Sequence, residues 1–222
     1  MKSLIIKILI GVAVGVACKF IGDQLERFFL KERKLEFRRG KIEDVLVLLA
    51  TGGFGIAILL RTGSIPEMIY IFLLMIVSQV ITLTDFHHRV IPNESLLMIF
   101  ALKIAFGVPF LFGMEKFPEF SIIGSLVGMA VSFIIFLVPA VISKQVGAGD
   151  IKLAAAMGFA LGLSGSMTAI VLMGVLVIIY TILQKQTPVL EMVKTMIPMG
   201  PFLAVSMIVV LLLPDQLFVL HI

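Results

Sequence analysis

Repeated apolar runs are the feature that most constrains this chain. Runs of about 17–25 residues, the length that a helix needs to cross a bilayer, recur along most of the sequence. The composition agrees, because 60% of the 222 residues are hydrophobic and only 14% are charged, whereas soluble domains are about a quarter charged. The sequence therefore predicts a multi-pass membrane protein in which one all-α, transmembrane helix bundle takes residues 1–222 and the lipid bilayer is a partner.

About eight spans are predicted from these runs. The N-terminal run is interpreted as a retained first span rather than as a cleaved signal peptide. Two glycines and two serines within residues 162–166 predict a tight turn between the sixth and seventh helices. The predicted spans are residues 4–21, 45–60, 65–84, 94–112, 120–142, 150–163, 166–183 and 197–213.

Loop charge predicts the orientation in the cell membrane. Loops rich in Lys and Arg stay in the cytoplasm, and the even-numbered loops contain only Arg61 and Lys116. The odd-numbered loops are therefore expected in the cytoplasm and the N-terminus outside. Because the net charge of +4 comes from these loops, no nucleic-acid partner is predicted. The basic residues of the odd-numbered loops are Arg27, Lys31, Arg33, Lys34, Arg38, Arg39, Lys41, Arg89, Lys144, Lys152, Lys185 and Lys194.

Two polar motifs interrupt the apolar pattern, and each contains one aspartate at the end of a predicted span. Asp85, in DFHHRVIPN, closes the third span, and Asp150, in GAGDIK, opens the sixth. The loop charges place both at the cytoplasmic face. Acidic residues at such a depth are costly and mark functional sites. Two carboxylates that share a proton can activate water and protonate a peptide carbonyl, which predicts an aspartic protease that needs no cofactor.

Glycine and proline flank both aspartates. Gly147 and Gly149 are expected to give the backbone before Asp150 unusual torsions and to let a substrate strand approach. Pro92 prevents the third helix from continuing, and Asn93 is predicted to cap the fourth span.

A third proline-glycine element lies near the start of the eighth span. Pro198, Gly200 and Pro201 are expected to break the helix there. Non-helical backbone at membrane depth is tolerated only where it is buried in protein or lines a cavity. The element could therefore line an active cleft, or it could be an ordinary proline kink.

Four other groups of residues have both a functional and a structural interpretation. His87 and His88 could bind a metal, but no further ligand set accompanies them, so interfacial histidines are favoured and no metal site is predicted. Ser164 lies in a GxSG sequence typical of serine proteases, but the only later histidine is His221, so we interpret the match as a turn.

Lys103 is interpreted as facing the bundle interior or snorkelling. Two GxxxG pairs, beginning at residues 11 and 124, predict close helix packing within one chain or between chains, which leaves the oligomeric state open.

Three sequence elements together resemble the type IV prepilin peptidase family of GxGD-type intramembrane aspartic proteases. They fit the patterns D-x5-[IL]-P-[ND], G-x-G-D-x-K and P-x-G-P-F-L, in that order. The resemblance implies that Asp85 and Asp150 are catalytic. It also implies that Pro92, Asn93, Gly147, Gly149, Lys152, Pro198, Gly200 and Pro201 shape the site or bind substrate. For Lys152, interaction with a nearby carboxylate and anchoring at the interface both stay open. The matched residues are Asp85, Ile91, Pro92, Asn93, Gly147, Gly149, Asp150, Lys152, Pro198, Gly200, Pro201, Phe202 and Leu203.

The resemblance also implies a substrate class. It would be a prepilin or pseudopilin, with a basic leader, a glycine before the cut and a hydrophobic helix after it. Larger family members have a cysteine-rich zinc domain after the first span and N-methylate the new N-terminus. Here Cys18 is the only cysteine, so neither zinc nor methyltransferase activity is expected. The alternatives are a non-proteolytic membrane assembly factor of a pilus or type II secretion system that keeps the fold, and a transporter with a proton relay.

Overall fold

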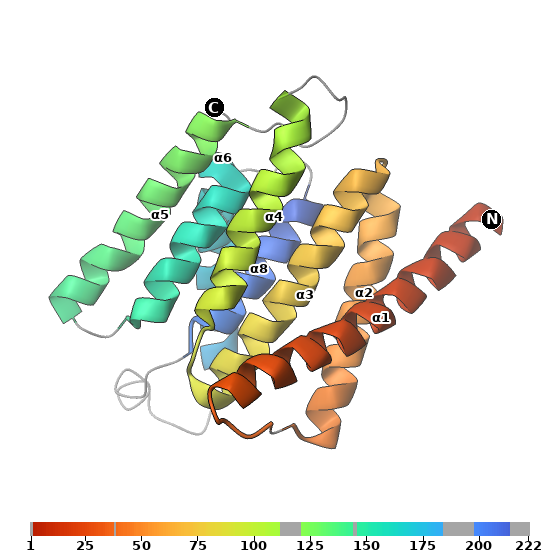
Figure 1. The fold of residues 1–222 in the computed structure, drawn as a ribbon, viewed down its shortest axis with the longest axis horizontal. Coiled ribbons are helices and arrows are strands. Elements are labelled where there is room, and N and C mark those ends of the chain that lie inside the picture. The colour runs from red at the N-terminus through yellow and green to blue at the C-terminus, as the bar shows by residue number, and fades with distance from the viewer. Residues whose placement is uncertain (1, 38, 112–120, 144–145, 184–197, 214–222) are drawn as a thin grey trace.

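The computed structural model is all-helical, as the sequence predicts, and describes residues 2–37, 39–111, 121–143, 146–183 and 198–213. Most of the helices lie side by side, and α1 crosses the bundle diagonally (Figure 1). The helices in the described residues are α1 (Lys2–Glu32), α2 (Lys41–Arg61), α3 (Ile65–His88), α4 (Asn93–Leu111), α5 (Ile122–Ser143), α6 (Ala148–Leu183) and α8 (Gly200–Leu212).

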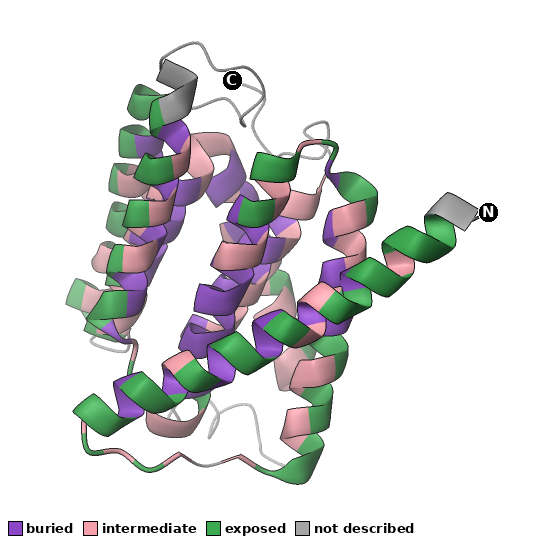
Figure 2. Ribbon diagram, turned by 45° about the vertical axis from the view of Figure 1, so that its right-hand side comes forward, coloured by how far each residue is buried: buried purple, intermediate pink, exposed green. Residues whose placement is uncertain are grey.

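Helix α3 is the centre of the bundle. In its most apolar 18-residue window 78% of the residues are buried, against 22% or less in the corresponding windows of α1, α2, α5 and α6. It packs against α1, α4 and α8, and α8 in turn packs against α6. The buried surface is concentrated on these inner helices, whereas α1 buries one narrow stripe (Figure 2). The outward apolar surface of the other helices is what a lipid-facing bundle requires.

Five helices in the described part of the chain, α1, α2, α3, α5 and α6, are long and apolar enough to cross a membrane, and α8 is a shorter apolar helix. Within the described residues, each of the predicted spans coincides with a helical segment. The predicted turn after the sixth span is also found, but it is tighter than expected. Gly162 alone is non-helical, with φ 72° and ψ −175°, and separates the two helices that together form α6. Such a φ is accessible chiefly to glycine.

The predicted end of the first span is wrong. Helix α1 continues from the predicted last residue, Ile21, to Glu32, through a stretch that the polar sequence assigned to a loop. Its polar residues Asp23 and Glu26 are buried, because they pair with Arg39 from the segment that follows α1. Charge pairing between segments therefore lets the helix continue past the apolar run.

Glycine contacts join the outer helices to their neighbours. A Cβ atom at Gly11 or Gly15 of α1 would collide with the backbone of α2, and one at Gly128 of α5 would collide with the backbone at Gly158 and Gly162 of α6. The close packing predicted from the GxxxG pairs is therefore found within one chain at Gly11, Gly15 and Gly128, whereas a Cβ atom at Gly124 would meet only the nearby Ser121 side chain. This packing holds α1 against α2, and α5 against α6.

The bundle brings four helix ends to one side. Helix α3 ends, and α4, α6 and α8 begin, at the lower end of the molecule in Figure 1. This end contains both sequence motifs and the proline-glycine element, and it is the place where the candidate site is assembled.

Candidate active site

Asp85 lies in the last turn of α3. The sequence placed the helix end at Thr84, but α3 continues to His88 and is closed by Arg89, whose backbone is left-handed with φ 53° and ψ 39°. The Arg89 N–H donates to the carbonyl of Asp85 at 2.9 Å. The Asp85 residue is only 6% exposed, so its carboxylate needs a partner inside the protein.

That partner is the start of α8. The backbone N–H of Gly200 donates to Oδ2 of Asp85 at 3.1 Å. The first N–H groups of a helix have no partner within the helix, and the helix dipole places partial positive charge there. Helix α8 therefore presents its positive end to the Asp85 carboxylate.

The proline-glycine element begins this helix instead of breaking it, which corrects the prediction from sequence. Met199 is the N-cap and Pro201 lies in the first turn, where the missing N–H of proline costs nothing. Pro198 lies just before the cap and is half-buried. Gly200 is required for space, because a Cβ atom there would lie 2.6 Å from Oδ2 of Asp85.

Asp150 lies in the first turn of α6, as the sequence predicts, and is half-buried. Its N–H donates to the carbonyl of Gly147 at 3.1 Å, and its carboxylate accepts a hydrogen bond from the Gly147 backbone. Oδ1 of Asp150 is buried and has no hydrogen-bond partner among the described residues. The charges of Asp85 and Asp150 are near enough to interact electrostatically, so the fold brings the two predicted carboxylates together.

The two glycines before Asp150 act through space and not through unusual torsions. Among the described residues Gly162 is the only glycine with positive φ, so the torsional role expected of Gly147 and Gly149 is wrong. A Cβ atom at Gly147 would lie 3.1 Å from Oδ2 of Asp150, and one at Gly149 would lie 3.4 Å from the Ile91 side chain. Gly149 thus allows the loop after α3 to pack against the start of α6.

A second contact joins the same two segments. Nζ of Lys152 donates to Oδ1 of Asn93 at 3.3 Å, in an exposed position. Asn93 is the first residue of α4, and this contact is the side-chain hydrogen bond found for it in place of the predicted cap. Pro92, just before it, is buried. The first and second motifs therefore form one continuous surface.

The other polar residues singled out from the sequence form neither a metal site nor a serine-protease site in the part of the chain that the structure describes. Nε2 of His87 is 3.6 Å from Oε2 of Glu43, and within the described ranges no group of three or more His, Cys, Asp or Glu side chains could hold a metal. Gly162 of the GxSG sequence is the kink in α6, whereas His221 falls outside the described residues. Lys103 is 8% exposed and so faces the bundle interior.

Sequence reasoning missed a buried polar cluster next to this end of the molecule. Lys19 bridges Asp23 at 2.9 Å and Asp44 at 2.8 Å, and Arg39 pairs with both aspartates and with Glu26. Gln79 of α3 donates to Oδ1 of Asp23 at 2.9 Å, which ties the cluster to the helix that ends at the candidate site. The available signal was the spacing of residues 19, 23 and 26, which places three charges on one face of an otherwise apolar helix.

Arg39 is the centre of this cluster. Burial alone would lower the pKa of its guanidinium, but hydrogen bonding to Asp23 and the negative charge of Glu26 raise the pKa above its ordinary value. The guanidinium is therefore charged throughout the physiological range, and it holds the segment between α1 and α2 against the bundle.

Comparison with known proteins agrees with this geometry. Residues 72–182, half of the chain and including both aspartates, match the type IV leader peptidase family. The chain belongs to the type IV leader peptidase family. This is an aspartic protease family, and the resemblance inferred from the motifs is thereby confirmed. The elements that the match leaves out are α1, α2, α8 and the first residues of α3.

A relative in this leader peptidase family also aligns with about half of the chain. It is the prepilin leader peptidase/N-methyltransferase of Bacillus subtilis (strain 168), which is 38% identical over 119 residues. The alignment covers 52% of this chain and 42% of the relative, so the chain spans less than half of the length of that protein. No solved structure matches.

Proposed function

We propose that this protein is an intramembrane aspartic endopeptidase that removes the basic leader from type IV prepilins or pseudopilin-like proteins. The observation that supports this most directly is the convergence of Asp85 and Asp150 at one end of the bundle, within electrostatic range of each other. Membership of the leader peptidase family supports the substrate class.

In the proposed reaction the two carboxylates share one proton. The ionised carboxylate accepts a proton from water as the water oxygen attacks the scissile carbonyl carbon, and the protonated one donates to the carbonyl oxygen. The proton taken from water then passes to the leaving amine as the C–N bond breaks. The N–H of Gly200 fixes the position of Asp85, and the free Oδ1 of Asp150 is available to the water or the shared proton. No cofactor enters these steps.

The cleavage is proposed to occur at the cytoplasmic membrane face. The segment between α1 and α2 and the one between α3 and α4 contain the basic residues Arg33, Lys34, Arg39 and Arg89, and both lie at the same end of the bundle as the two aspartates (Figure 1). The opposite end has Arg61 at the end of α2. By the positive-inside rule the end with the aspartates faces the cytoplasm and the N-terminus lies outside.

The direct test is incubation of the purified protein with a panel of prepilin peptides, followed by mass spectrometry of the new N-termini. The proposed function predicts a single cut between the basic leader and the hydrophobic segment. The same spectra report N-methylation, which we do not include in the proposal. A folded protein that leaves every prepilin intact would instead support a non-proteolytic assembly factor.

A further inference from the structure

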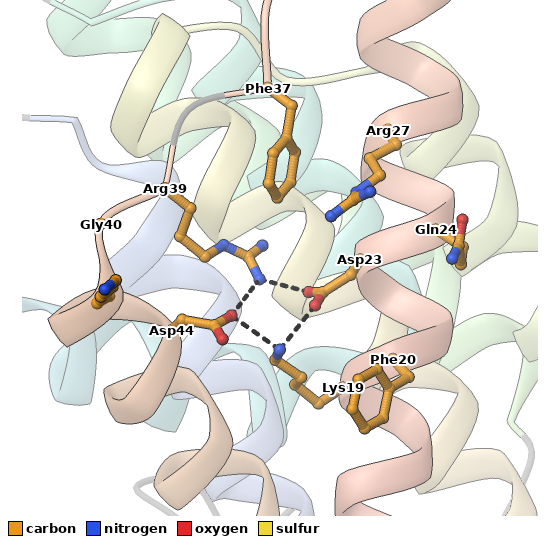
Figure 3. Close-up of a pocket in the computed structure, with 10 residues that line it drawn as sticks. Lys19, Phe20, Asp23, Gln24, Arg27, Phe37, Arg39, Gly40 and Asp44 are labelled. Carbon is orange, nitrogen blue, oxygen red and sulfur yellow. Dashed lines mark hydrogen bonds and ion pairs between the residues drawn. The ribbon is translucent and has the colours of Figure 1, made fainter.

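A cavity lies in the wedge between α1 and α2, on the outside of the bundle. Its volume is about 480 Å³, within the range of small-molecule sites. The α1 and α2 helices diverge from their glycine contact, and the segment that joins them closes the wide end of the wedge. Figure 3 shows Lys19, Asp23 and Arg27 of α1, Phe37 and Arg39 of the joining segment, and Asp44 of α2 around this cavity.

The floor of the cavity is electrically balanced. Lys19 and Arg39 alternate with Asp23 and Asp44 in a ring of four ion pairs (Figure 3). Each carboxylate in the ring already has two cationic partners. The floor therefore offers no free carboxylate to a cationic ligand.

The mouth, in contrast, is positively charged. Arg27 and Lys41 line the cavity, are exposed, and make no ion pair with any described residue. The Arg27 guanidinium stacks on the Phe37 ring at 4.5 Å from its centroid, which holds it toward the cavity (Figure 3). Lys41 is the first residue of α2, and its exposed ammonium adds a second positive charge to the lining of the cavity. An anion is the ligand that this mouth fits.

The surroundings of the mouth are apolar. Phe20 of α1 lines the cavity and exposes more than half of its surface. Val45, one turn after Lys41 on α2, also exposes more than half of its surface. On α1 the apolar run gives way to charged residues at Lys19, and on α2 the charged first turn gives way to an apolar run at Val45. The cavity therefore lies where the hydrocarbon of a bilayer meets its headgroups. A ligand with a negative headgroup and acyl chains matches both surfaces.

We propose that this wedge is a binding site for one anionic phospholipid. Its phosphate lies between Arg27 and Lys41, and its acyl chains lie along the exposed apolar side chains of α1 and α2. The phosphate of a net-neutral lipid would carry its own compensating ammonium. Because Arg27 and Lys41 add two positive charges to a ring that is already balanced, they favour a lipid with net negative charge. This site is separate from Asp85 and Asp150, and it stands whether or not the protein is a peptidase.

The test uses the purified full-length protein in detergent and native mass spectrometry of bound lipid. Phosphatidylglycerol, phosphatidylcholine with the same acyl chains, and inorganic phosphate are titrated separately. The double variant Arg27→Gln/Lys41→Gln is compared with Lys31→Gln/Lys34→Gln, which removes the same charge from exposed residues that do not line the cavity. Thermal unfolding without lipid checks that each variant is folded, and the Arg27→Lys/Lys41→Arg variant keeps both charges.

The expected result is preferential binding of phosphatidylglycerol, weakened about 30-fold in Arg27→Gln/Lys41→Gln, as removal of two interfacial cations predicts. The Lys31→Gln/Lys34→Gln and charge-keeping variants should retain the binding. Equal weakening in both Gln variants would show diffuse surface charge and overturn the proposal. So would equal binding of the two lipids, or competition by inorganic phosphate at concentrations that match the lipid.

Discussion

At the scale of single residues, the contact between Gly200 and Asp85 is what joins the third sequence element to the other two. The sequence identifies both residues as candidates, but it does not show that they meet, because they are 115 positions apart. Only the packing of α8 on α3 decides that the start of one helix faces the end of the other. Asp150, by contrast, lies in the predicted first turn of its helix, because a local motif fixes a local structure.

Replacing Gly200 by Ala should lower the rate of leader cleavage by about 10- to 100-fold, the effect of displacing a catalytic group by about 1 Å. Alanine keeps the N–H donor, but its Cβ atom would lie 2.6 Å from Oδ2 of Asp85 and push the carboxylate aside. Gly174→Ala is the matched control, since a Cβ atom there meets nothing within 4 Å. Cleavage at the normal rate by Gly200→Ala would show that the Asp85 position does not depend on this contact.

The contacts of Arg39 lead to a prediction about stability, also at the scale of single residues. Replacing Arg39 by Met leaves Glu26, whose side chain is 1% exposed, without its partner, and loss of one member of a buried pair costs about 3–5 kcal/mol. Arg33→Met should cost less than about 1 kcal/mol, because its partner Glu94 is 47% exposed. Denaturant unfolding in detergent measures both.

The loss of stability in Arg39→Met should be partly reversed when Glu26 is also replaced by Gln, because the buried charge left without a partner is then removed. Equal destabilisation by Arg39→Met and Arg33→Met would mean that the cluster contributes no more than an ordinary surface pair.

At the scale of helices, apolar run length predicts where each helix lies, and polar pairing decides where it ends. The end of α1 could not be predicted, because Asp23 and Glu26 look like loop residues until Arg39 and Gln79 are placed beside them. The turn at Gly162 was predictable from its glycines, although the sequence did not show that one residue would suffice.

The packing of α5 on α6 depends on small residues, and this can be tested with Gly158→Val. The added side chain would collide with the Gly128 backbone and lie against Ser132, and overpacking of this kind costs about 1–3 kcal/mol or more. The thermal unfolding temperature should fall, with no change in oligomeric state by light scattering. Gly174→Val, in the same helix with free space around it, should unfold close to the wild-type temperature, and a similar temperature for both variants would refute this account of the interface.

At the scale of the whole molecule, the bundle places the basic segments and both aspartates at one end. The orientation is tested by labelling single cysteines with an impermeant maleimide in intact cells, in a Cys18→Ala background. Lys34→Cys, at the aspartate end, should react only after the membrane is opened. Gly63→Cys, between α2 and α3, is exposed and should react in intact cells. The reverse pattern would place the aspartates outside.

The central claim is that Asp85 and Asp150 act as one catalytic unit. The most direct measurement is the rate at which purified Asp85→Asn, Asp150→Asn and the double variant release the leader from a prepilin, with equal amounts of folded protein. Each single variant should lose at least about a thousandfold in rate, and the double variant should lose no more, because residues that act as a unit are not additive. Cleavage at the wild-type rate by either single variant would contradict the claim.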